Sequence, residues 1–174
     1  MVIPGWLIAL LTFPGVMLHE LAHKIFCDWF RVPVFEVRYF QFGERESGYV
    51  KHGEPKSFSQ HLFICVGPLV VNSLVACLLG AMVAQAIEKS PLYWLLGWLA
   101  VSAGMHAFPS GQDARNIAEA ARKARANGGS VLLIATFPFV ALLHTANALR
   151  FLWFDALYAA FIVLVGHSIG EVLQ

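Results

Sequence analysis

The sequence predicts an all-α, polytopic membrane protein with about five transmembrane helices and a small β-hairpin between the first two. Composition is the first reason: 58% of the 174 residues are hydrophobic and only 13% are charged, and the mean hydropathy is +0.65. A soluble domain is about half apolar and about a quarter charged. The second reason is that the excess lies in long apolar runs. The third is that basic residues concentrate in the connections between those runs.

The apolar runs define the predicted spans, because a bilayer core of roughly 30 Å requires about 20 residues of helix. Ser90-Pro91 separates the second span from the third, and Asn127-Gly128-Gly129 precedes the fourth. No positively charged region precedes the first run, so we expect a retained span rather than a cleaved signal peptide. Residues 1–174 are therefore expected to form one membrane domain. The predicted spans are residues 4–30, 60–87, 91–108, 130–149 and 151–172.

Two connections, residues 31–59 and 111–127, hold most of the Lys and Arg residues outside the spans. The positive-inside rule places both in the cytoplasm, with the N-terminus outside and the C-terminus inside, and we expect the cell membrane. Alternating side chains at 35–39 predict a strand, with 49–52 as its returning partner; an ordinary amphipathic loop is the alternative. Residues 111–127 predict a polar, Ala-rich helix at the cytoplasmic surface.

Charge and cysteine content exclude other classes of protein. The net charge is +1, so no basic surface indicates a nucleic-acid partner. Cys27, Cys65 and Cys77 are odd in number and lie within or beside apolar runs. Buried thiols, rather than a disulfide framework, are expected.

The first span contains the motif His19-Glu20-Leu21-Ala22-His23. Positions i and i+4 of a helix lie on one face, so His19 and His23 can present two imidazole nitrogens to one metal ion. Glu20 projects off that line, which suits a base rather than a ligand. Ionisable residues near the bilayer centre cost about 2.5–3.5 kcal/mol each on insertion scales and are usually functional. A polar helix–helix contact is the alternative.

A catalytic zinc site has three protein ligands and an open position, so a third ligand is needed. Asp113 is the best candidate, because Pro109 and Gly111 should end the third span and turn the chain at the cytoplasmic side, at the depth of the motif. The alternative role of Asp113 is to cap the polar helix that follows. His106 is the rival ligand, and as a neighbour it can also serve as a hydrogen-bond donor to the site.

The second span also carries polar and helix-breaking residues. Pro68 frees a backbone carbonyl within the membrane, which is tolerated only where protein or a wet cavity satisfies it. Gly67 permits close helix approach. Asn72 lies at a depth similar to that of His19, and an interhelical hydrogen bond is the alternative to a catalytic role.

Taken together, the chain resembles the site-2 protease family of intramembrane zinc metalloproteases. The likeness rests on three motifs in order, His19 to His23, Gly67-Pro68-Leu69-Val70-Val71-Asn72, and 109–113, and it covers about residues 4–116. It implies Zn²⁺ held by His19, His23 and Asp113, Glu20 as catalytic base, and Asn72 near the substrate or oxyanion. The third motif departs from the family pattern, since His106 replaces an Asn and Ala114 a Gly. A small, divergent member without a PDZ-like domain is implied.

The function that follows is hydrolysis of peptide bonds in membrane-associated or transmembrane substrates. Glu20 takes a proton from water activated by zinc and delivers it to the leaving amine, with Asn72 or His106 as candidate oxyanion donors. The strand at 35–39 is expected to hold an unwound substrate segment. Two rival hypotheses remain: a zinc-binding membrane protein without protease activity, such as an inactive homologue or assembly factor, and a purely structural subunit. The sequence does not determine the oligomeric state.

Overall fold

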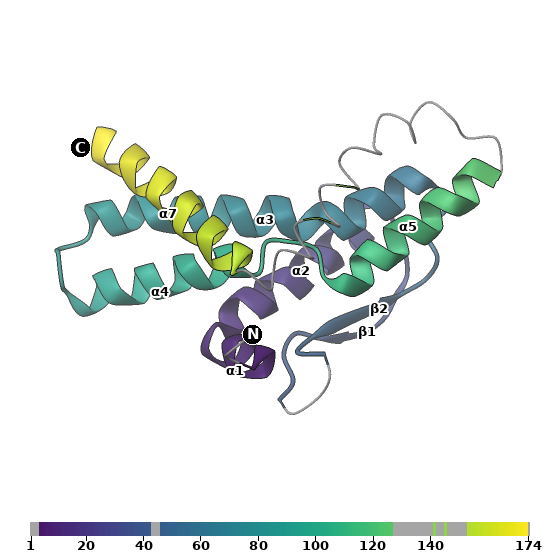
Figure 1. The fold of residues 1–174 in the computed structure, drawn as a ribbon, viewed down its shortest axis with the longest axis horizontal. Helices are drawn as coiled ribbons and strands as arrows, with labels where there is room; N and C mark the ends of the chain where they lie inside the picture. The colour runs from purple at the N-terminus through teal and green to yellow at the C-terminus, as the bar shows by residue number, and fades with distance from the viewer. Residues whose placement is uncertain (1–3, 43–45, 127–140, 142–144, 146–152, 174) are drawn as a thin grey trace.

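The computed structural model describes residues 4–42, 46–126, 141, 145 and 153–173, and this part of the chain is mostly helical with one small two-stranded sheet (Figure 1). α3 and α4 form an antiparallel helical hairpin, and α7 crosses both. α2 packs on α3 and α4, and the sheet and α5 lie toward the other end of the molecule. The elements are α1 Gly5–Leu11, α2 Phe13–Trp29, β1 Val34–Arg38, β2 Tyr49–His52, α3 Phe58–Gln85, α4 Pro91–Met105, α5 Gly111–Ala126 and α7 Phe154–Val172.

Two described helices, α3 and α7, are long and apolar enough to cross a membrane, and the bent pair α1–α2 makes a third if it is one span. Many large apolar side chains of these helices face outward, as membrane helices require. α4 is apolar but has only 15 residues, about 22 Å of helix. The predicted span 130–149 lies outside the described residues. Within the described residues the structure therefore indicates membrane association through two or three helices that can cross a membrane, and the five predicted spans are not confirmed.

The predicted first span, 4–30, is not one continuous helix in the structure. The chain bends by 89° between α1 and α2. Pro14 stands in the first turn of α2, where its missing N–H leaves no helical bond unmade. In the bend, Ser102 of α4 donates its hydroxyl to the Thr12 carbonyl and accepts the N–H of Gly15, both at 2.8 Å. A side chain from another helix thus caps the N-terminus of α2.

The sheet confirms the small hairpin predicted after the first apolar run. β1 and β2 pair antiparallel, with an irregularity between Val34 and Glu36. The Glu36 carboxylate accepts hydrogen bonds from the Tyr49 hydroxyl at 2.6 Å and from the Lys51 ammonium at 3.0 Å. These bonds lower the pKa of Glu36 to about 2. One exposed carboxylate thereby ties both strands together.

α5 is the polar helix expected at 111–127, and it packs on α3 through one apolar face. Ile117 is fully buried against Cys65 and Phe108. On its polar face Lys123 pairs with Glu54, in the connection before α3, at 2.9 Å. These contacts fix the direction of α5 so that its N-terminus points toward α2 (Figure 1).

Candidate metal centre

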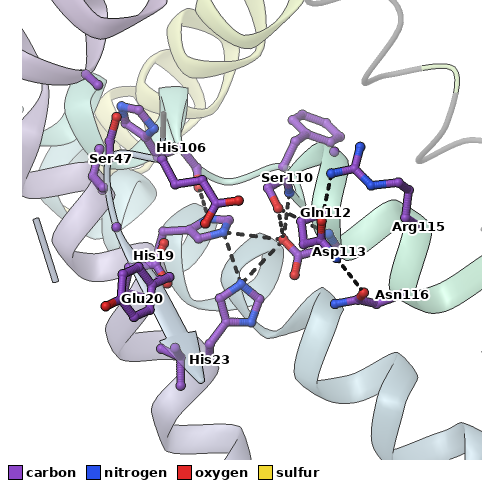
Figure 2. Close-up of a pocket in the computed structure, with 18 of the residues that line it drawn as sticks. His19, Glu20, His23, Ser47, His106, Ser110, Gln112, Asp113, Arg115 and Asn116 are labelled. Carbon is purple, nitrogen blue, oxygen red and sulfur yellow. Dashed lines mark hydrogen bonds and ion pairs between the residues drawn. The ribbon is translucent and has the colours of Figure 1, made fainter. Parts of the chain in front are cut away.

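His19 and His23 lie on one face of α2, as their spacing predicts, and both are buried at 7% exposure. Their Nε2 atoms are 3.1 Å apart. Figure 2 shows the two rings meeting the Asp113 carboxylate, which arrives from the start of α5. Asp113 Oδ2 lies 3.7 Å from Nε2 of His19 and 3.5 Å from Nε2 of His23.

These separations fit a single metal ion. Donor atoms each about 2.0–2.1 Å from one tetrahedral ion lie about 3.3 Å from one another. The three observed separations, 3.1, 3.5 and 3.7 Å, are close to that value. His19, His23 and Asp113 are all buried, and together they can hold a metal ion.

The orientation of the rings gives a second, independent argument for a cation. His19 Nδ1 lies 2.7 Å from the carbonyl of His106, and His23 Nδ1 lies 2.9 Å from the carbonyl of Ile64. A carbonyl only accepts, so each Nδ1 donates and each neutral ring presents its Nε2 lone pair. Two lone pairs and a carboxylate oxygen then face one another in a buried space. Only a cation between them, a proton or a metal ion, relieves that repulsion.

Asp113 is held by the turn that begins α5. Its Oδ2 accepts the Ser110 N–H at 2.8 Å and the Ser110 hydroxyl at 2.6 Å, while its own N–H donates to Ser110 Oγ at 3.1 Å. This reciprocal pair is a capping box. The predicted alternatives for Asp113, ligand and helix cap, therefore coexist in one side chain.

The pKa of the Asp113 carboxyl is lowered in this setting. Burial raises its pKa, but the hydrogen bonds of His23 and His19, and the positive charge these rings carry when protonated, outweigh burial, so the pKa lies well below its ordinary value. An ionised carboxylate is the form that a metal ion binds.

Glu20 is buried at 8% exposure and faces the same cavity as the two histidines. The hairpin packs directly on its side chain, because a Cβ on Gly48 would lie 2.8 Å from Glu20 Cγ and 3.0 Å from two hairpin carbonyls. Any side chain at Gly48 would collide with Glu20 or with Arg38 and Tyr39. The glycine thus lets the carboxylate of Glu20 lie between α2 and the hairpin.

The cavity beside the candidate centre has a volume of about 460 Å³. One wall is formed by α5, where Gln112 Oε1 accepts from Arg115 at 2.7 Å and Gln112 Nε2 donates to Asn116 at 2.9 Å (Figure 2). The opposite wall takes Tyr49, Val50 and His52 from β2 and, within the described residues, none from β1. The strand predicted to adjoin the site was the first one, 35–39; the structure places the second strand there.

Asn72 lies at the centre of the helix bundle rather than in the cavity. It is fully buried, and its Nδ2 lies 3.2 Å from each of the carbonyls of Gly15, Ala103 and His106. These carbonyls belong to α2 and to the end of α4. The geometry favours the interhelical role that the sequence left as an alternative, because the amide is already engaged with backbone of two neighbouring helices.

His106 lines the cavity but is not among the three grouped ligands. Its Nε2 lies 2.8 Å from the Thr12 hydroxyl, which itself donates to the Ile8 carbonyl at 2.6 Å. The ring therefore donates to the bend between α1 and α2. The backbone carbonyl of His106 contacts the candidate ligand His19.

Sequence reasoning missed Ser110, Gly48 and Ser102. Ser110 carried a usable signal, since Ser-x-x-Asp before an Ala-rich helix is a capping-box pattern. Gly48 and Ser102 act through contacts between segments far apart in the chain, for which one sequence offers no local signal. No protein-family model matches this chain, and no curated protein and no solved structure was found to match it.

Proposed function

We propose that this protein is an intramembrane zinc metalloprotease, similar to the site-2 protease family, that hydrolyses peptide bonds of membrane-associated or transmembrane substrates. One observation supports it above the others. His19, His23 and Asp113 converge within an apolar helical protein, and Glu20 faces the same cavity. A polar contact between helices does not by itself require two Nε2 lone pairs that face a carboxylate oxygen.

Zinc is the metal that suits this donor set. Two imidazole nitrogens and one carboxylate oxygen form the three-ligand set of catalytic zinc sites, which keep a fourth position open. When bound, zinc supplies a Lewis acid that activates water near neutral pH and polarises the scissile carbonyl. Each imidazole has its other nitrogen bonded to a backbone carbonyl, the arrangement that fixes metal-binding histidines.

Glu20 is the proposed general base. It follows His19 directly in the motif, so it projects beside the ligand face rather than on it. In this role its carboxylate accepts a proton from water and returns it to the amine that leaves. Burial of Glu20 against Gly48 keeps the carboxylate at one place in the cavity.

The substrate is proposed to bind as an extended segment along β2. A transmembrane helix has its amides internally bonded, so a segment must unwind before a peptide bond can be attacked. β2 pairs with β1 on one side, and its residues line the cavity. Addition of an extended strand to a sheet edge is a common mode of peptide binding.

The protein is further proposed to be a multi-pass protein of the cell membrane, with the site open to the cytoplasm, because the basic hairpin and α5 flank it.

The decisive experiment follows cleavage of a single-span reporter by the purified protein in liposomes. We expect Glu20→Gln to lower the cleavage rate by a factor of about 10² or more. The zinc content of the protein should be unchanged. Glu88→Gln is the matched control, since Glu88 is exposed in the α3–α4 connection and 78% of its side chain is accessible. Equal cleavage by wild type and Glu20→Gln would show that the protease proposal is wrong.

A zinc-binding membrane protein without protease activity is the second candidate. The observation in its favour is that the Asn72 amide, an expected oxyanion donor, is engaged with three backbone carbonyls. If this candidate is right, the wild-type protein binds zinc at full occupancy. In the same assay it cleaves no unwound single-span reporter.

A further inference from the structure

Pro68 interrupts the hydrogen bonding of α3 at its centre. It is fully buried and stands inside a helix of 28 residues. A proline nitrogen carries no hydrogen, so the carbonyl four residues earlier, that of Ile64, loses its helical partner. Ile64 is buried at 1% exposure, so little water is available to replace that partner.

The carbonyl of Ile64 is the acceptor for His23. His23 Nδ1 donates to it at 2.9 Å, across 41 positions of sequence. In a regular helix this oxygen would already accept a backbone N–H along the helix axis. The interruption at Pro68 and the orientation of His23 therefore coincide at one oxygen atom.

From this coincidence we propose that Pro68 is a positioning residue of the metal centre. By removing one N–H from α3 it leaves the Ile64 carbonyl to bind Nδ1–H of His23. That bond turns Nε2 of His23 toward His19 and Asp113. The proposal rests on the proposed function in one respect only, namely that a metal ion is held by these three residues.

Neighbouring contacts separate this role from simple packing. The close approach of α2 and α3 at this level is provided by Gly67, where a Cβ would lie 2.4 Å from the Phe26 ring. Gly67, rather than Pro68, therefore provides the room for the Phe26 ring at this level. His19, the other imidazole, is oriented by the carbonyl of His106 at the end of α4 rather than by a carbonyl of α3. The same molecule thus contains one histidine that depends on Pro68 and one that does not.

The test compares Pro68→Ala with wild type, using the full chain in detergent micelles. Alanine restores the N–H, which competes with His23 for the Ile64 carbonyl. We expect the affinity for Zn²⁺ alone to fall about 10–100-fold, the usual effect of losing an outer partner of a metal-binding histidine. Imidazole ¹⁵N spectra of the metal-free protein should show a changed Nδ1 signal for His23 and an unchanged signal for His19. Pro91→Ala is the control, since Pro91 lies in the first turn of α4, where a missing N–H breaks no helical bond.

Each outcome decides the matter. A change at His23 alone, with weaker zinc binding, supports the proposal. If the Nδ1 signals of both histidines change, Pro68 supports the fold generally. If neither signal changes, the availability of the Ile64 carbonyl does not depend on Pro68. Both results overturn the proposal and leave the proposed function intact. If wild type itself does not bind Zn²⁺, the proposed function fails, and the role of Pro68 fails with it.

Discussion

Asp113 Oδ2 serves two structures at once, because it faces two imidazoles and also accepts two hydrogen bonds from Ser110. The hydroxyl of Ser110 therefore orients a candidate metal ligand as well as capping α5. We expect Ser110→Ala to weaken zinc binding about 10–100-fold and to destabilise the protein by about 0.5–2 kcal/mol. Calorimetric titration with zinc and chemical denaturation measure the two effects.

Ser110→Thr is the matched control, since threonine keeps the hydroxyl and is also a good N-cap. It should retain most of the zinc affinity. If alanine and threonine bind zinc as tightly as wild type, the hydroxyl does not position Asp113, and the contact is only a helix cap.

At the scale of single residues, the sequence predicted the pair of candidate ligands and left open the roles of the residues around it. Helical spacing alone places His19 and His23 on one face, and Pro109 and Gly111 turn the chain so that Asp113 can meet them. Asn72 and His106 could not be assigned in the same way. Their positions depend on which backbone carbonyls of α2 and α4 lie within reach, and that is decided by tertiary packing.

At the scale of elements, the hairpin beside the cavity depends on one carboxylate. The pKa of Glu36 falls from its ordinary 4.5 to about 2 when Tyr49, Lys51 and Arg38 bond to it. Because its pKa is lowered on folding, the ionised Glu36 carboxylate stabilises the hairpin above pH 4.5. That contribution is lost as the carboxylate is protonated between pH 4.5 and about 2. We expect the protection factors of the β1 and β2 amides, which are corrected for the intrinsic pH dependence of exchange, to fall through this window, as followed by mass spectrometry.

Glu36→Gln should remove most of that pH dependence, because glutamine does not titrate. Glu119→Gln, a change to an exposed carboxylate on α5, should leave it in place. A pH dependence that persists in Glu36→Gln would mean that another group controls the hairpin.

The helix α7 is held by very close packing. A Cβ on Gly166 would lie 2.0 Å from the carbonyl oxygen of Cys77 in α3. We therefore expect Gly166→Ala to displace α7 and to destabilise the bundle by about 1–3 kcal/mol, the usual effect of overpacking. Unfolding in denaturant, followed by circular dichroism in micelles, measures it. Gly97→Ala is the matched control, because among the described residues no atom outside its own helix turn lies within 4 Å of a Cβ there. Equal stability of both variants would contradict the close packing of α7.

The helices themselves were largely predictable, and the bend between α1 and α2 was not. Apolar runs and the Ser90-Pro91 junction located α3 and α4 to within a few residues. The run 4–30 also contained a warning, Pro14, since proline is typical of a first helical turn. What makes a break there stable is Ser102, which caps α2 from another helix. A cap supplied from 87 positions away is invisible to a local pattern.

At the scale of the whole molecule, the candidate centre is built where three helices depart from regular hydrogen bonding. Pro68 frees a carbonyl inside α3, and α4 ends at Met105 so that the His106 carbonyl is available. At the start of α5 the Ser110 N–H bonds the Asp113 carboxylate instead of a helical carbonyl. Each irregularity supplies a partner to one of the three ligands. The fold and the site are therefore specified by the same residues.

Because the candidate ligands come from α2 and α5, a metal ion bound there would tie the polar helix to the apolar helices. We expect zinc at 100 times its Kd to stabilise the protein by about 2.7 kcal/mol. Removal with a chelator should lower the thermal midpoint and accelerate hydrogen exchange in the first turns of α5. Asp113→Asn should abolish the response to chelator, since the amide is a poor ligand. Asp28→Asn, which changes an exposed ion pair of α2 with Lys24, should respond as wild type does. A thermal midpoint that is the same with and without chelator in the wild type would mean that no metal ion joins the two helices, and the convergence of His19, His23 and Asp113 would then be an ordinary protonated cluster.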